Sequence, residues 1–170
     1  MLNEKFILFR IHRFRDKSAY AKLYERYHKN ILDFASFKMP RKQDAEEVAS
    51  EVFLRGWEYA TSNRVDNIKA LFYRIARNLI ADFYRQRKVE DSLDELADVA
   101  ADQEIEERID LSESANKLIA RIRALKGDMS EVCVMHYINE LSVKEIADIL
   151  DKSPNNIRVI LHRAKKALNK

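Results

Sequence analysis

The segment "SPNNIRVILHRAKKAL", residues 153–168, places amide and basic side chains at helical spacing behind a serine–proline pair. A serine hydroxyl caps the free N–H groups at a helix start, and proline at the first helical position gives up no hydrogen bond. A helix that begins there turns its apolar residues to one side. Its other side carries Asn155, Asn156, Arg158, His162, Arg163, Lys165 and Lys166. In a major groove, asparagine pairs with adenine and arginine with guanine, while clustered cations suit phosphates.

A second helix comes directly before this one. Ser142 and Glu145 form the Ser-x-x-Glu pattern of a capping box, which starts a helix. That helix should end near Leu150, which leaves Asp151 and Lys152 as the turn. Helix, short turn and helix over about 142–168 is the layout of the helix-turn-helix motif, so we predict that this region binds duplex DNA. An ordinary corner between two helices with a solvated outer face is the alternative.

A helix predicted from Asp66 to about Lys88 carries a different polar surface. Its predicted core stripe is Ile68, Leu71, Phe72, Ile75, Leu79 and Phe83. The face opposite this stripe interleaves rings with polar and basic groups: Tyr73, Arg74, Arg77, Asn78, Tyr84, Arg85, Arg87 and Lys88. Bases stack on exposed rings with about 1–3 kcal/mol each and cations follow the backbone, so this face suits an unpaired nucleic acid strand. A charged helix face with tyrosines at its rim is the alternative and the commoner case.

A third surface lies on a helix predicted over about 42–60. Its apolar stripe consists of Ala45, Val48, Ala49, Val52, Phe53 and Gly56. The opposite side carries an acidic stripe with one leucine in it: Glu47, Ser50, Glu51, Leu54 and Glu58. Such a stripe repels DNA and suits a protein partner, although an exposed leucine alone means little.

Charge divides the chain into three parts. Residues 1–88 hold 19 Lys and Arg against 11 Asp and Glu, and residues 115–170 hold 11 against 6. The intervening stretch 89–114 holds one arginine against 11 carboxylates and has no aromatic residue. Basic blocks are typical of proteins that bind polyanions, and an acidic stretch with weak periodicity is typical of an extended linker. Ordinary solvated surface charge is the alternative.

These patterns predict an all-α protein with two small helical domains. The chain has only two glycines and two prolines in 170 residues, which leaves few strand turns. We predict a three-helix bundle in 1–88, whose first helix starts at Asp16 and runs towards Lys38. A linker at 89–114 then leads to four helices in 115–170. The first of these spans about 114–125, and the second runs from Asp128 to near Asn139 with Asp128 and Glu131 as a capping box.

Several function classes find no support in the sequence. No apolar run approaches 18 residues, so we predict no membrane span, and the N-terminal stretch lacks a signal-peptide cleavage pattern. Cys133 is the only cysteine, which suits a reducing cytoplasm. The four histidines are scattered, and neither a glycine-rich phosphate loop nor metal-ligand spacing occurs. We therefore expect no enzyme activity, no metal and no cofactor.

Three segments together resemble the extracytoplasmic-function sigma factors of the sigma-70 family. They are "DAEEVASEVFLRGWEYA" at 44–60, "IKALFYRIARNLIADFYRQRK" at 68–88 and "EVCVMHYINELSVKEIADILDKSPNNIRVILHRAKKAL" at 131–168. Their order and spacing match, and the resemblance covers nearly the whole chain. It implies a protein that binds core RNA polymerase and directs it to promoters, with a sigma-2-like domain at 1–88 and a sigma-4-like domain at 115–170. An anti-sigma protein is a further partner in many family members.

The resemblance also implies roles for the surfaces described above. The acidic stripe at Glu47, Ser50, Glu51 and Leu54 would dock on the clamp coiled coil of the largest polymerase subunit. The polar face of 68–88 would meet the −10 strand, with the 61–67 loop holding a flipped base. The 153–168 helix would enter the major groove of the −35 element, and the acidic linker would lie in the RNA-exit path. A stand-alone helix-turn-helix regulator that binds duplex DNA as a dimer is the alternative function.

Some positions depart from the family pattern. Leu71 stands where tryptophan is common, Ser50 where glutamine is frequent, and Asp151 where the turn has glycine. In the last helix, Val159 replaces a small polar residue and Ile160 replaces an arginine. We predict a weaker DNA contact at position 160, and we expect the promoter preference of this chain to arise near these positions.

Overall fold

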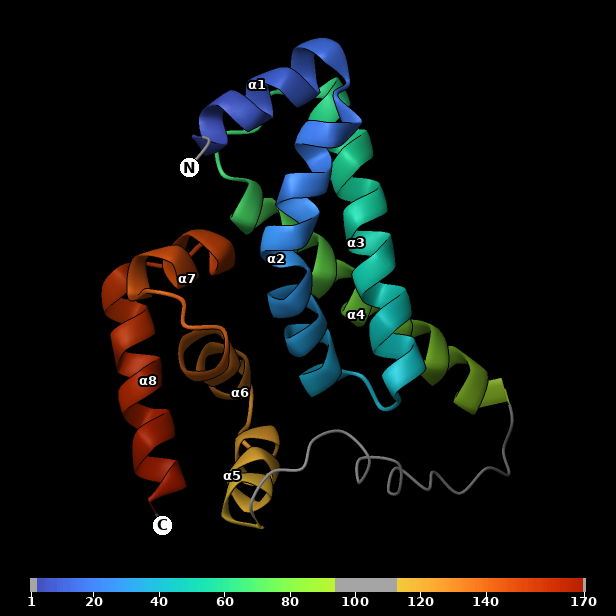
Figure 1. The fold of residues 1–170 in the computed structure, drawn as a ribbon. Coiled ribbons are helices and arrows are strands. Elements are labelled where there is room, and N and C mark those ends of the chain that lie inside the picture. Colours follow the sequence, from blue (N-terminus) through green and yellow to red (C-terminus); the bar gives the residue numbers. More distant parts are fainter. Residues whose placement is uncertain (1–2, 94–112, 170) are drawn as a thin grey trace.

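The protein was analysed as a computed structural model that describes residues 3–93 and 113–169 (Figure 1). Its elements are α1 (Glu4–Phe14), α2 (Lys17–Lys38), α3 (Lys42–Ser62), α4 (Ile68–Leu93), α5 (Glu113–Arg123), α6 (Asp128–Cys133), the π-helix η1 (Val134–Ile138), α7 (Val143–Leu150) and α8 (Pro154–Leu168). No strand occurs within the described ranges, so the predicted all-α class is confirmed. None of the described helices is long and apolar enough to cross a membrane.

The N-terminal half is a bundle of α2, α3 and α4 with α1 packed across one end (Figure 1). Asp16 caps α2 by accepting a hydrogen bond from the Ala19 amide at 3.0 Å, as predicted. The sequence prediction missed α1. This helix buries Ile7, Leu8 and Ile11 against the bundle, and it ends at Arg15, whose φ of 49° lies in the left-handed region. The predicted three-helix bundle therefore has a fourth helix as a cover.

The buried face of α4 differs from the predicted stripe. Ile68 and Phe72 are fully buried, but Leu71, Ile75, Leu79 and Phe83 are only partly buried. The residues that complete the core are Ala70, Tyr73, Ala76 and Ile80. The reason is tertiary: α4 packs against α2 and α3 on one side and against α7 on another, so more of its circumference is covered than in an isolated bundle.

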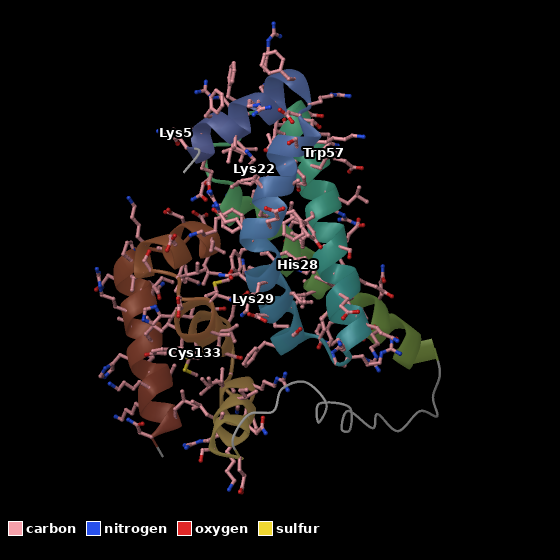
Figure 2. The ribbon with its side chains drawn as sticks, in the orientation of Figure 1. Lys5, Lys22, His28, Lys29, Trp57 and Cys133 are labelled. Atoms are coloured by element: carbon pink, nitrogen blue, oxygen red, sulfur yellow. The ribbon has the colours of Figure 1, made fainter. Side chains whose placement is uncertain are left out.

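The C-terminal helices begin and end close to the predicted positions. Ser142 and Glu145 form the complete capping box of α7, and the Ser153 hydroxyl accepts from the Asn156 amide at 3.2 Å with Pro154 in the first turn of α8. Asp151 adopts a φ of 52° at the turn, where glycine is the usual residue. Figure 2 shows Cys133 among these helices, and its thiol is buried.

The predicted capping box at Asp128 and Glu131 needs correction, and most of the predicted linker at 89–114 lies outside the described residues. Asp128 is the first residue of α6 but not its cap, because Gly127 occupies the cap position with no side-chain hydrogen bond. Glu131 turns inward instead of closing a capping box. The predicted linker at 89–114 is helical at both edges, since α4 runs to Leu93 and α5 starts at Glu113. Residues 94–112 lie outside the described residues.

Gly56 of α3 lies where the core leaves no room for a side chain. A Cβ atom at this position would lie 2.5 Å from Cε1 of Phe72 and 2.9 Å from the Tyr20 hydroxyl oxygen. We expect Gly56→Ala to lower the free energy of unfolding by about 1–3 kcal/mol, because overpacking outweighs the helix propensity gained. Urea unfolding followed by circular dichroism measures this. Ser50→Ala on the exposed side of α3 is the control, and equal stability of both variants would contradict the tight contact.

Candidate nucleic-acid interface

The outward side of α8 presents every residue predicted to contact duplex DNA. Ile157, Leu161 and Ala164 are buried against α6 and α7, so the helix has one fixed inner side. The other side projects away from the molecule (Figures 1 and 2). It exposes Asn155, Asn156, Arg158, His162, Arg163, Lys165 and Lys166. Within residues 3–93 and 113–169, none of their side chains takes part in an ion pair.

The two unusual residues of α8 have opposite environments. Ile160 is half-buried and packs against the core, whereas Val159 is 40% exposed among the polar residues. Position 160 therefore points inward, which accounts for an isoleucine there without reference to DNA. Val159 is the residue of the pair that stands on the outward side.

The predicted single-strand surface on α4 divides into an open and a covered part. Asn78, Arg85, Arg87 and Lys88 are exposed. Tyr84 is 42% exposed, and its hydroxyl donates to the backbone carbonyl of Lys38. Burial raises the pKa of Tyr84 above its ordinary value of 10.0. The open part thus holds one partly exposed ring together with three cations and an amide.

In the covered part of this surface, one tyrosine is buried and two arginines donate hydrogen bonds to the C-terminal helices. The prediction that Tyr73 is exposed is wrong, because its side chain is 1% exposed and its ring packs edge-on against Phe34 at 5.2 Å. Arg77 donates from Nε to the Glu131 carboxylate at 2.8 Å. Arg74 donates to the backbone carbonyls of Asp148 and Ile149. Two of the predicted strand-binding cations are therefore occupied by the other half of the chain.

Further polar contacts join the two halves. Asn30 and Asn139 exchange hydrogen bonds, each side-chain amide donating to the other residue's carbonyl, at 3.3 and 3.2 Å. Lys38 lies 3.6 Å from Glu131, and Lys69 pairs with Glu145. The junction is thus rich in charged and amide groups, unlike the apolar interior of either half.

The electrostatics of Glu145 favour its charged form. Burial alone would raise the pKa of this carboxyl, but hydrogen bonds from Lys69 and from Ser142 outweigh burial and leave the pKa below its ordinary value of 4.5. The Lys69–Glu145 pair is therefore intact at neutral pH.

The acidic stripe of α3 faces solvent as predicted. Glu47 and Ser50 are exposed, and Leu54 is 53% exposed. Glu51 is half-buried and accepts from Arg55 at 2.6 Å. With Gln43 and Glu46, these residues line one shallow groove along α3.

The sequence analysis did not predict the contacts that Asn30, Glu131 and Asn139 make between the two halves. Glu131 carries a usable signal in the sequence, because four apolar residues follow it directly. An isolated carboxylate inside an apolar run needs a cationic partner from elsewhere in the chain. The predicted loop at 61–67 is shorter in the structure, because α3 continues to Ser62. At the other end of the loop, Asn67 caps α4 by accepting a hydrogen bond from the Ala70 amide at 2.9 Å.

Comparisons with known families agree with this layout. The family model for sigma-70 region 2 matches residues 23–90, and the model for sigma-70 region 4 matches residues 115–168. The ECF RNA polymerase sigma factor SigW of Bacillus subtilis is 29% identical over 169 residues, covering 91% of this chain and 89% of SigW. SigM of the same organism is 24% identical, covering 86% of this chain and 90% of SigM.

Solved structures share the fold. CnrH, determined in complex with the cytosolic domain of CnrY, has a TM-score of 0.73 at 17% identity and covers 98% of this chain and 94% of its own. The sigma factor RpoE from Bartonella quintana, determined with the anti-sigma factor NepR, has a TM-score of 0.67 at 18% identity, covering 87% and 92%. Since regions 2 and 4 both match in order, the chain belongs to the extracytoplasmic-function group of the sigma-70 family, the sigma factors that direct transcription initiation at promoters.

Proposed function

We propose that this sigma factor brings core RNA polymerase to promoters through three separate surfaces. The outward side of α8 enters the major groove of the −35 element, the polar face of α4 holds the −10 strand, and the acidic stripe of α3 docks on the clamp coiled coil of the largest polymerase subunit. The observation that carries this proposal is α8, whose sharp start and free polar side fit a recognition helix. The protein acts by binding, without catalytic chemistry, in the cytoplasm.

The two ends of α8 have different roles in binding DNA. Asn155 and Asn156 stand in the first turn, where a recognition helix reaches base edges most deeply. Lys165 and Lys166 stand in the last turn, where they suit phosphates and position the helix. Arg163 lies between these ends and can serve either purpose.

On α4, strand binding requires the two halves to separate. Asn78, Tyr84, Arg85, Arg87 and Lys88 are available as they stand. Arg74 and Arg77 are held by hydrogen bonds to the C-terminal helices, and Tyr73 is buried. We infer that the described arrangement is a closed form that precedes promoter binding. An anti-sigma protein, such as the NepR bound to RpoE, is a partner suited to hold it closed.

A stand-alone helix-turn-helix regulator is less well supported. Such a protein needs α8 but gives no role to the ring and cations on α4 or to the acidic stripe on α3. Run-off transcription with bacterial core polymerase and a promoter library separates the two functions. The sigma factor should co-elute with core enzyme and start specific transcripts, and the absence of both would overturn the proposal.

The acidic stripe can be tested by a double substitution. Glu51→Lys with Leu54→Ala should weaken binding to core polymerase by about tenfold or more, because a charge is reversed and an exposed apolar anchor is lost. Circular dichroism should show an unchanged helix content. Glu25→Lys on the exposed side of α2 is the matched charge reversal, and it should bind core polymerase normally. Normal binding by the double variant would remove the role assigned to α3.

The stacking role of Tyr84 predicts a selective defect. Tyr84→Ala should weaken binding of the holoenzyme to an unpaired −10 strand by about 1–3 kcal/mol, because one stacking platform is lost. Binding to −35 duplex should not change. Fluorescence anisotropy with the two labelled DNAs measures both, and Tyr137→Ala, another exposed tyrosine, is the control. Equal losses on both DNAs would contradict stacking at position 84.

The Lys69–Glu145 pair predicts that acid opens the closed form. The folded-state pKa of Glu145 is lowered, so its contribution is full above about pH 4.5 and is lost as the pH falls through the folded-state pKa. Glu145→Gln preserves the capping box but removes the charge, and it should loosen the junction at neutral pH and flatten the acid response. Energy transfer between dyes on α4 and α8 measures the separation. Asp148→Asn on the same helix is the control, and an unchanged acid response in Glu145→Gln would contradict this role.

A further inference from the structure

We propose that Val159 recognises the 5-methyl group of a thymine in the −35 element and so determines part of the promoter preference. This inference rests on the proposed function of α8. Val159 is 40% exposed on the side that carries the predicted base and phosphate contacts. Its neighbour Ile160 packs against the core, so the two apolar residues have different roles.

The position of Val159 is central on the outward side. Asn155 precedes it by four residues and Arg163 follows it by four, so the three side chains form one line along α8. Neighbours at this spacing have Cβ atoms about 5–6 Å apart. A helix that presents Asn155 to a base edge therefore presents Val159 to the same groove, one turn further along.

The chemistry of the side chain selects its target. An isopropyl group neither donates nor accepts hydrogen bonds, and the thymine C5-methyl is the one apolar group that bases display in the major groove. The surrounding side chains of Asn155, Arg158, His162 and Arg163 end in hydrogen-bonding groups, so none of them substitutes for this contact. A β-branched side chain on a helix is also held near one rotamer, which fixes where its methyl groups lie.

The spacing restricts which thymine is read. One helical turn advances about 5.4 Å, and successive base pairs are about 3.4 Å apart. The methyl group that Val159 contacts should therefore lie within about two base pairs of the base that meets Asn155. Because asparagine pairs best with adenine, the preferred −35 sequence should contain an adenine and a thymine at this close spacing.

Deoxyuridine provides a direct test, because it lacks only the methyl group of thymidine. The holoenzyme, made from the full chain and bacterial core polymerase, first selects its preferred −35 duplex from a randomised library. Each thymidine of that duplex is then replaced in turn by deoxyuridine, and binding is measured. One replacement should weaken binding by about fourfold, the value for burial of one methyl group.

Variants at position 159 make the assignment specific. Val159→Ala should bind the thymidine and deoxyuridine duplexes equally at that position, and Val159→Thr, which keeps one methyl, should discriminate to an intermediate degree. Ile160→Val is the control and should discriminate like the unaltered protein. If the selected duplex binds but no replacement matters, or if Val159→Ala still discriminates, the inference is overturned while −35 binding stands. If no duplex is selected above random DNA, the proposed role of α8 fails as well.

Discussion

The buried carboxylate of Glu131 is the interaction on which the relation between the two halves depends. Its side chain is 7% exposed, and it lies between Arg77 of α4 and Lys38 at the end of α2. A carboxylate removed from water is strongly unfavourable unless cations compensate it, so this group fixes where α6 sits on the N-terminal bundle. The Asn30–Asn139 exchange and the Lys69–Glu145 pair then set the rotation of α7 and η1 around that point.

A polar junction of this kind fixes the relative position of the two halves, yet the two halves separate readily. Ions and amides that separate regain favourable hydrogen bonds to water. Large apolar surfaces that separate gain no such compensation, because their exposure to water is unfavourable. Asn139 illustrates the incomplete fit, because its side-chain oxygen is buried without a hydrogen-bond partner in the described parts of the chain. The apolar interior of each half, by contrast, is closed by aromatic contacts such as Phe53 with Phe72 at 4.8 Å.

Sequence reasoning succeeded where the cause of a structure is local. The caps at Asp16, Ser142 and Ser153 act within three residues, so their patterns suffice to place the helix starts. It failed at Glu131, whose local pattern suggested a capping box although its partner Arg77 is 54 residues away. Tyr73 was assigned to the open side of α4 for the same reason. Its ring packs against Phe34 of α2, a tertiary contact that local periodicity does not report.

The contrast between α4 and α8 bears on how such proteins diversify. Arg77 holds the junction and belongs to the predicted −10 surface, so a substitution there alters two properties at once. The outward cations of α8 have no ion-pair partner within the described residues, and their replacement leaves the packing of Ile157 and Leu161 intact. After gene duplication, a copy should therefore acquire new promoter preferences mainly through substitutions in the last helix. The −10 surface should change more slowly.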